Sequence, residues 1–155
     1  MKTMCFTGHR PDKLPWGSDE TSESYRAFRL KLMAAIYHAV EEGYAHFITG
    51  MAEGIDLMAA EIVLELRAAR PDITLECALP YRKNGSARFQ RILQQADTIT
   101  AVSENYHSAC MRMRNRYMVD QSDMVLAVYT GSSGGTKQTI EYARAQGKKV
   151  QMLAP

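Results

Sequence analysis

Sequence features typical of metal-binding or disulfide-stabilised proteins are missing from this chain. It has no CxxC pair and no Cys/His spacing of the kind that holds zinc. Its three cysteines, Cys5, Cys77 and Cys110, are odd in number and far apart. Cys5 and Cys77 fall in expected strands, where a free thiol packs as a small apolar group. We therefore expect no metal site made by protein side chains, and a reduced, cytoplasmic setting.

Long apolar runs and strong net charge are missing as well. No run approaches the roughly 20 residues that span a bilayer, and no signal-peptide segment precedes the first expected strand, so we expect no membrane partner. The net charge of +2 is too small to indicate nucleic acid by itself, and a nucleic-acid partner is not expected. Arginines cluster locally at Arg112, Arg114 and Arg116, which could be a solvated helix face.

Two nucleotide-binding fingerprints are also absent. No GxGxxG follows the first expected strand, and no acidic residue ends the second strand where a dehydrogenase would have one. A Walker phosphate loop requires Gly-Lys followed by Ser or Thr, whereas here Thr136 precedes Lys137 and Gln138 follows it. Dehydrogenase, ATPase and GTPase activities are therefore disfavoured.

Strands and helices alternate along the whole chain, whose 155 residues predict a single domain, 1–155. The expected strands are residues 2–7, 45–49, 73–79, 97–102, 124–129 and 149–153. The expected helices are residues 24–42, 54–70, 86–95, 111–122 and 136–146. This alternation predicts a three-layer, Rossmann-like, doubly wound α/β fold with a mostly parallel sheet.

The strand order expected for that fold is 3-2-1-4-5-6. Strands one and four would then meet at the switch point, and ligands bind there, at the carboxyl ends of the strands. The loops after strands one, two and five would line one crevice.

A loop rich in glycine and serine after the fifth strand is the strongest functional signal. It follows the apolar run Met124–Val128 and precedes a helical pattern. Strand, loop and helix in this order aim unpaired backbone N–H groups and a helix dipole at an anion. The alternative is a flexible surface loop. The residues expected to bind a phosphate-bearing ligand here are Gly131, Ser132, Ser133, Gly134, Gly135 and Thr136.

Two further loops are expected to share this crevice. After the first strand, Gly8 allows close backbone approach, and Arg10 suits phosphate or carboxylate binding, although it could instead pair with Asp12. After the second strand, Gly50 and Gly54 let the chain turn tightly. The ligand-binding residues expected in these two loops are Thr7, Gly8, His9, Arg10, Gly50, Met51, Ala52, Glu53 and Gly54.

Charged side chains near these loops are candidates for chemistry. Glu53 lies between two glycines, where it would suit hydrogen bonding to ribose hydroxyls or general acid/base catalysis. Asp56 is expected to cap the helix that follows. Arg114 and Asn115 stand near the start of a helix and could turn toward the ligand, so both are candidate binding residues.

Together these motifs resemble the SLOG superfamily, and most closely its YpsA-like branch. The superfamily joins the LOG-type phosphoribohydrolases with the DNA-processing protein A (Smf) family. The resemblance covers nearly the whole chain. Its carriers are TGHRP at 7–11, GMAEGID at 50–56, RN at 114–115 with MVD at 118–120, and GGTK at 134–137.

The resemblance implies a Rossmann-like fold that binds a nucleotide or a nucleotide-derived ligand. LOG-type enzymes cleave the N-glycosidic bond of nucleoside monophosphates, using an Arg in Met-x-x-Arg-Lys-x-x-Met and a Glu in Pro-Gly-Gly-x-Gly-Thr-x-x-Glu. Residues 111–118 match the first pattern, with Arg114 at the catalytic arginine and Asn115 in place of Lys. The second pattern is not met, because Thr139 stands where the Glu should be and Glu141 lies two residues further on.

We therefore expect binding of a nucleotide or an ADP-ribose-like ligand at the carboxyl ends of the strands, as a binding module or sensor. The alternative is a LOG-like N-glycosidase (phosphoribohydrolase) acting on nucleoside 5′-monophosphates, with Glu53 and Arg114 as its catalytic residues. A second alternative is single-stranded DNA binding, by analogy with the DNA-processing branch. A phosphate ligand could bring Mg²⁺ with it, and the likeness to LOG-type dimers suggests a homo-oligomer.

Overall fold

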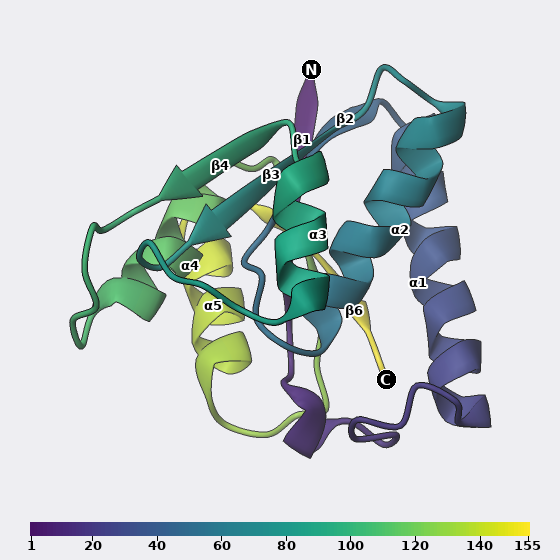
Figure 1. Cartoon of the computed structure of the whole chain (residues 1–155), viewed down its shortest axis with the longest axis horizontal. Coiled ribbons are helices and arrows are strands. Elements are labelled where there is room, and N and C mark those ends of the chain that lie inside the picture. The colour runs from purple at the N-terminus through teal and green to yellow at the C-terminus, as the bar shows by residue number, and fades with distance from the viewer.

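The computed structural model describes residues 1–155 as a sheet of six parallel strands with helices on both faces (Figure 1). The strands are β1 (Lys2–Gly8), β2 (Tyr44–Thr49), β3 (Thr74–Leu79), β4 (Thr98–Ala101), β5 (Met124–Val128) and β6 (Lys149–Leu153). The helices are α1 (Glu23–Glu41), α2 (Ile55–Ala69), α3 (Ala87–Gln95), α4 (Cys110–Asp120) and α5 (Gly135–Ala145), with a 3-10 turn η1 (Pro11–Lys13). The bounds predicted from the sequence agree to within two residues. No helix combines the length and apolar character that crossing a membrane would require.

The sheet confirms the Rossmann-like fold class and corrects the strand order. The order is β4-β3-β2-β1-β5-β6 rather than 3-2-1-4-5-6, so β5 lies beside β1, with Cys5 opposite Val125. β5 is buried along its whole length, whereas Thr98 and Ile99 of β4 are exposed. A strand that is apolar on both faces belongs inside a sheet, and a half-exposed strand belongs at an edge. The switch point of this sheet therefore lies between β1 and β5.

The two faces of the sheet are covered unequally. Helices α1, α2 and α3 pack on one face, and α4 and α5 pack on the other (Figure 1). The core under α1, α2 and α3 has 29 buried residues, among them Phe6 and Phe47, whose rings stack at 6.2 Å. The core under α4 and α5 has 7. Because the second core is small, the position of α4 depends more on polar contacts.

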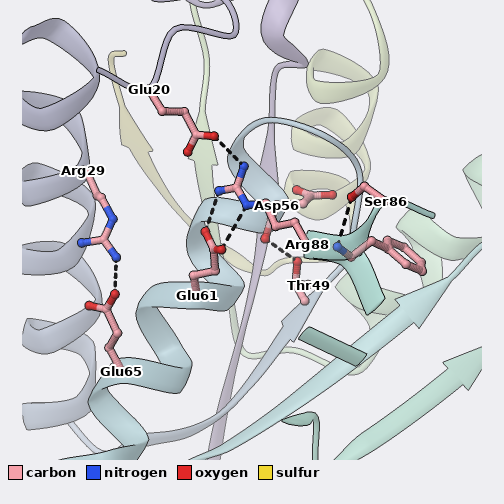
Figure 2. A network of polar contacts seen from close by, with 9 residues as sticks. Glu20, Arg29, Thr49, Asp56, Glu61, Glu65, Ser86 and Arg88 are labelled. Atoms are coloured by element: carbon pink, nitrogen blue, oxygen red, sulfur yellow. Dashed lines mark hydrogen bonds and ion pairs between the residues drawn. The ribbon is translucent and has the colours of Figure 1, made fainter. Parts of the chain in front are cut away.

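The long segment between β1 and α1 is fixed against the helices that follow it. Trp16 is buried and stacks on Phe28 of α1. Near the end of the segment, Glu20 accepts a hydrogen bond of 3.0 Å from Arg88 of α3. The same guanidinium donates two hydrogen bonds to Glu61 of α2 (Figure 2). The end of this segment is thereby held against α2 and the first turn of α3.

A polar network beneath α4 joins this helix to the sheet. The carboxylate of Glu76 in β3 is buried and accepts hydrogen bonds from Tyr117 of α4 at 2.5 Å and from Thr100 of β4 at 2.8 Å. Nε2 of His46 lies 2.8 Å from the other carboxylate oxygen of Glu76. Burial opposes ionisation of Glu76, but these hydrogen bonds outweigh burial and hold the pKa of Glu76 below its ordinary value. The network therefore fixes α4 to β3 through an ionised carboxylate.

Glu76→Gln should destabilise the protein in a pH-dependent way. Because the pKa of Glu76 is lower in the folded chain than in the unfolded one, its contribution is present above the ordinary carboxyl pKa and is lost as the pH falls through the folded value. We expect the variant to lose about 1 to 3 kcal/mol in the free energy of unfolding at pH 7. The difference from wild type should narrow below about pH 4.

Urea denaturation at a series of pH values measures this difference. Glu141→Gln, which changes an exposed glutamate on α5, is the matched control and should follow the wild-type curve throughout. If the loss in the free energy of unfolding of Glu76→Gln stayed constant from pH 7 to pH 3, the neighbours of Glu76 would not be stabilising its ionised form.

Candidate functional site

The main cleft of about 300 Å³ opens at the carboxyl end of β1, between η1 and the first turns of α2, α4 and α5. It therefore lies at the switch point, as expected for a ligand site in an open α/β sheet. Nine of the residues predicted from the sequence line it: Thr7, Gly8, His9, Arg10, Ala52, Arg114, Asn115, Gly135 and Thr136. The remaining lining residues are Phe6, Asp12, Lys13, Asp56 and Met111, which the sequence did not mark as ligand-binding.

A second compartment of about 100 Å³ adjoins the main cleft. The two compartments share four lining residues, which are Arg10, Ala52, Met111 and Arg114. Gly50, Met51 and Glu53 line this second compartment and not the main cleft. The residues predicted in the loop after β2 are thus divided between two adjoining spaces. Gly54 lies beside the backbone of His9, where an added Cβ would come within 2.7 Å of its carbonyl oxygen.

Of the residues predicted in the loop after β5, only Gly135 and Thr136 line the cleft. Gly131, Ser132 and Ser133 are exposed, and Gly134 precedes α5 without lining either compartment. The ammonium group of Lys13 donates a hydrogen bond of 2.7 Å to the carbonyl of Ser133. Only the end of this loop, where α5 begins, reaches the cleft. The first turn of α5 carries no side-chain cap, so its backbone N–H groups have no side-chain acceptor.

Arg114 is the most deeply buried cation of the cleft, with a relative exposure of 5%. Its guanidinium donates to the carbonyl of Gly50 and, at 2.8 Å, to the side-chain oxygen of Asn115. Its remaining amino group has only the sulfur of Met111, at 3.8 Å. None of the ion pairs in the structure involves Arg114 or Arg10, so Arg10 does not pair with Asp12. Burial lowers the pKa of Arg114. The negative charge of Asp56 opposes that shift, and the positive charge of Arg10 adds to it.

Asp56 lines the cleft, although the sequence did not predict it as a ligand-binding residue. Its carboxylate accepts a hydrogen bond of 3.2 Å from the backbone N–H of Ala52, in the loop before α2. Its own carbonyl accepts from the hydroxyl of Thr49 at 2.8 Å (Figure 2). Burial raises the pKa of Asp56, while Arg114, the Ala52 N–H and Arg10 oppose that rise. The sequence predicted a helix cap at Asp56; the cap residue is Gly54, and Asp56 instead fastens the loop.

His9 connects the two strands at the switch point. Its ring is buried, and Nε2 accepts a hydrogen bond of 3.1 Å from the backbone N–H of Thr130, after β5. Burial, followed by the charge of Lys13, lowers the pKa of His9, so the ring stays neutral near pH 7. Because Nε2 is an acceptor, the ring proton of the neutral form is on Nδ1. His9 therefore holds the loop after β1 against the loop after β5.

Close backbone approach explains two of the predicted glycines. A Cβ on Gly8 would lie 2.6 Å from Cβ of Ile55, which begins α2. A Cβ on Gly50 would lie 2.9 Å from a carboxylate oxygen of Asp56 and 3.0 Å from Arg114.

Met51, the next residue, has a φ of +62° and is the only non-glycine residue in the left-handed region. Strain of this kind is often found at functional sites.

The cleft is rich in cations but offers no metal site of its own. Arg10, Lys13 and Arg114 line it together with two carboxylates, Asp12 and Asp56. No group of three or more His, Cys, Asp or Glu side chains is placed to hold a metal ion. Guanidinium groups without carboxylate partners, beside free helix N-termini, are suited to an anionic ligand.

Fold and site together define a Rossmann-like α/β protein with a cleft at its switch point that Arg10, Lys13 and Arg114 line. Residues 4–154 match the model of the YspA SLOG family, and the chain belongs to that family. A UPF0398 protein of Bacillus thuringiensis (strain Al Hakam) is 27% identical over 161 residues, covering 96% of this chain and 85% of the relative. The UPF0398 protein BCB4264_A1614 of Bacillus cereus (strain B4264) is 25% identical over 158 residues, with the same coverage.

Solved structures support the fold. The crystal structure of TM1055, a structural-genomics target, superposes with a TM-score of 0.62 at 20% identity, over 97% of this chain and 72% of that one. DNA processing protein A from Helicobacter pylori is described with a single-stranded DNA binding mode. It superposes with a TM-score of 0.69 at 14% identity, over 97% of this chain and 64% of that one. DNA processing protein A from Streptococcus pneumoniae superposes with a TM-score of 0.69 at 16% identity, over 98% of this chain and 50% of that one. At these identities the likeness concerns the fold alone.

Gly50→Ala should disturb the packing around Arg114. The added methyl group would press on both Asp56 and Arg114, and overpacking of this kind costs about 1 to 3 kcal/mol. Gly135→Ala is the matched control, because a Cβ there would meet no atom within 4 Å. We expect its free energy of unfolding to stay within about 0.5 kcal/mol of wild type. Thermal or urea unfolding of both variants measures the difference, and equal stability of the two would contradict the packing described.

Proposed function

We propose that the cleft binds a nucleotide or a nucleotide-derived ligand through a phosphate group. The observation that carries this proposal is the pair Arg10 and Arg114, which face one cleft without any carboxylate in ion-pair distance. An arginine fork matches the geometry of phosphate oxygens, and the uncapped first turn of α5 adds backbone donors. Burying a cation without a counter-ion is costly, and a bound anion removes that cost.

The size of the site and the family support the same ligand class. The main cleft and the second compartment, of about 300 and 100 Å³, reach the range of about 300 to 1,000 Å³ that small-molecule sites occupy. Membership of a SLOG family favours a ligand related to nucleotides. Asp12 and Asp56 on the same cleft could accept hydrogen bonds from ribose hydroxyls.

Hydrolysis of a nucleoside 5′-monophosphate is the second candidate. Glu53 and Arg114 line the same second compartment, which favours a shared role. However, Glu53 is exposed and does not line the main cleft, whereas a general acid needs to reach the departing base. Asp56, buried and with a raised pKa, is the carboxyl group of the main cleft that could protonate a leaving group. We favour binding without cleavage because Thr139 stands where the LOG pattern has its Glu, and Glu53 does not line the main cleft.

Single-stranded DNA is a third candidate, from a different class of ligand. The DNA processing protein A of Helicobacter pylori binds it, and one surface feature here would suit bases. Tyr81 and Tyr106 form an edge-to-face pair at 5.6 Å near the ends of β3 and β4, and Tyr106 is 66% exposed. Exposed aromatic rings can stack with unpaired bases. The net charge of +2 does not favour a long polyanion.

Removing the Arg10 side chain should weaken nucleotide binding. Arg10 is exposed and makes no side-chain hydrogen bond, so Arg10→Ala should fold normally. We expect its affinity for AMP or ADP to fall about tenfold or more, since charge-assisted contacts to phosphate are strong. Arg144→Ala, in the last turn of α5, is the control and should bind as wild type does. Isothermal titration measures both variants; equal affinities for Arg10→Ala and wild type would contradict the proposal.

Incubation with AMP distinguishes binding from hydrolysis. We expect AMP to be recovered intact, because the chain has Thr139 in place of the Glu of the LOG pattern. Chromatography for adenine and ribose 5-phosphate makes the measurement. Release of both products that is lost in Glu53→Gln or in Asp56→Asn would instead establish the enzyme and identify its acid.

A further inference from the structure

The second compartment is a built part of the site that the sequence did not reveal. It lies between the loop after β2, the connection from β3 to α3 and the start of α4. Lys83 comes from the β3–α3 connection, and it is the only lysine that lines this space. Arg10 and Arg114 line both this space and the main cleft. A ligand held by these two arginines could therefore extend toward Lys83.

Three positive charges converge on this compartment without ion-pair partners. The Lys83 ammonium makes no ion pair or hydrogen bond and lies 5.6 Å from the centre of the Phe89 ring. Burial, followed by the charges of Arg114 and Arg10, lowers the pKa of Lys83, whereas the charge of Glu53 opposes that shift. Glu53 is the one acidic residue that lines the compartment, and it is exposed. An anion placed among the three cations would relieve their mutual repulsion.

The segment that carries Lys83 is firmly anchored. Phe89 is buried beside Gly85, where an added Cβ would lie 2.5 Å from the Phe89 ring. The hydroxyl of Ser86 accepts a hydrogen bond of 3.1 Å from the Phe89 N–H and so caps α3 (Figure 2). Arg88, next to Phe89, is fixed by Glu61 and Glu20. The chain that follows Lys83 is thus fixed from Gly85 onward, which limits the backbone ordering required when a ligand binds.

Lys83 differs from three of the arginines on and around α3. Arg88 on α3 and Arg29 on α1 form ion pairs with carboxylates (Figure 2). Arg67 on α2 forms one with Asp97. Lys83 has no carboxylate partner, and the two arginines that line the compartment with it, Arg10 and Arg114, have none either. An unpaired lysine in a half-buried position, facing two unpaired arginines, is the arrangement that a second phosphate would satisfy.

We infer that the second compartment holds a second anionic group of the same ligand, so that the preferred ligand carries a diphosphate rather than a single phosphate. This inference rests on the proposed binding of a nucleotide in the main cleft. One phosphate lies in the main cleft, near Arg10 and the first turn of α5. The other lies between Arg114 and Lys83. Nucleoside diphosphates, and diphosphates that link a nucleoside to a second sugar, have this chemistry.

The test compares AMP and ADP binding by isothermal titration in wild type and two Lys83 variants. Wild type should bind ADP about tenfold more tightly than AMP, because ADP alone reaches Lys83. Lys83→Met should remove that difference while leaving the affinity for AMP unchanged, and Lys83→Arg should retain it. Lys149→Met, which changes an exposed lysine of β6, is the control for general loss of charge and should behave as wild type does.

The outcomes separate this inference from the proposed function. Equal affinities for AMP and ADP in wild type, or an equal loss for both nucleotides in Lys83→Met, would overturn the inference and leave nucleotide binding intact. Failure of wild type to bind either nucleotide would overturn both. Near-ultraviolet circular dichroism of Lys83→Met confirms that a loss of affinity does not reflect unfolding.

Discussion

The Arg114 guanidinium is buried against the carbonyl of Gly50 with no carboxylate close enough to form an ion pair. A buried cation is stable only where backbone dipoles, fixed neighbours or a ligand replace its lost hydration. Several other features follow from this constraint. The turn at Gly50 has no room for a side chain. Helix α4 is fixed to β3 by the bond from Tyr117 to Glu76, one turn after Arg114. Asp56 is near enough to offset part of the charge without neutralising it.

The parallel sheet explains why these groups meet. The carboxyl ends of all six strands lie at one edge, so segments far apart in sequence converge where the strand order reverses between β1 and β5. His9 joins the loops after these two strands through Thr130, and Lys13 holds the loop after β5 through Ser133. Arg88, by contrast, forms ion pairs with both Glu20 and Glu61. The cleft keeps its positive charge available, which is the electrostatic condition for binding a phosphate.

Much of the fold was predictable from local patterns, whereas the site was predictable only in part. The strand and helix bounds followed from hydrophobic periodicity, and the loops after β1 and β2 were correctly expected near one crevice. The predicted place of β4 in the strand order was wrong, although its polar, half-exposed residues indicated an edge strand. Lys13 contacts the loop after β5 from 120 positions away in the sequence, and a contact of this range leaves no local signal. Lys83 and Asp56 lie outside any phosphate-loop motif, so only their three-dimensional positions reveal them.

A crystal structure of the protein grown with ADP would test the central claim most directly. The account predicts phosphate density in the cleft between Arg10, Arg114 and the first turn of α5, with Arg114 still bonded to the carbonyl of Gly50. A cleft without ligand density at saturating ADP, with Arg10 or Arg114 paired to Asp12 or Asp56 instead, would contradict it. In that case the positive charge of the cleft would be satisfied within the protein, and an anionic ligand would have no electrostatic role.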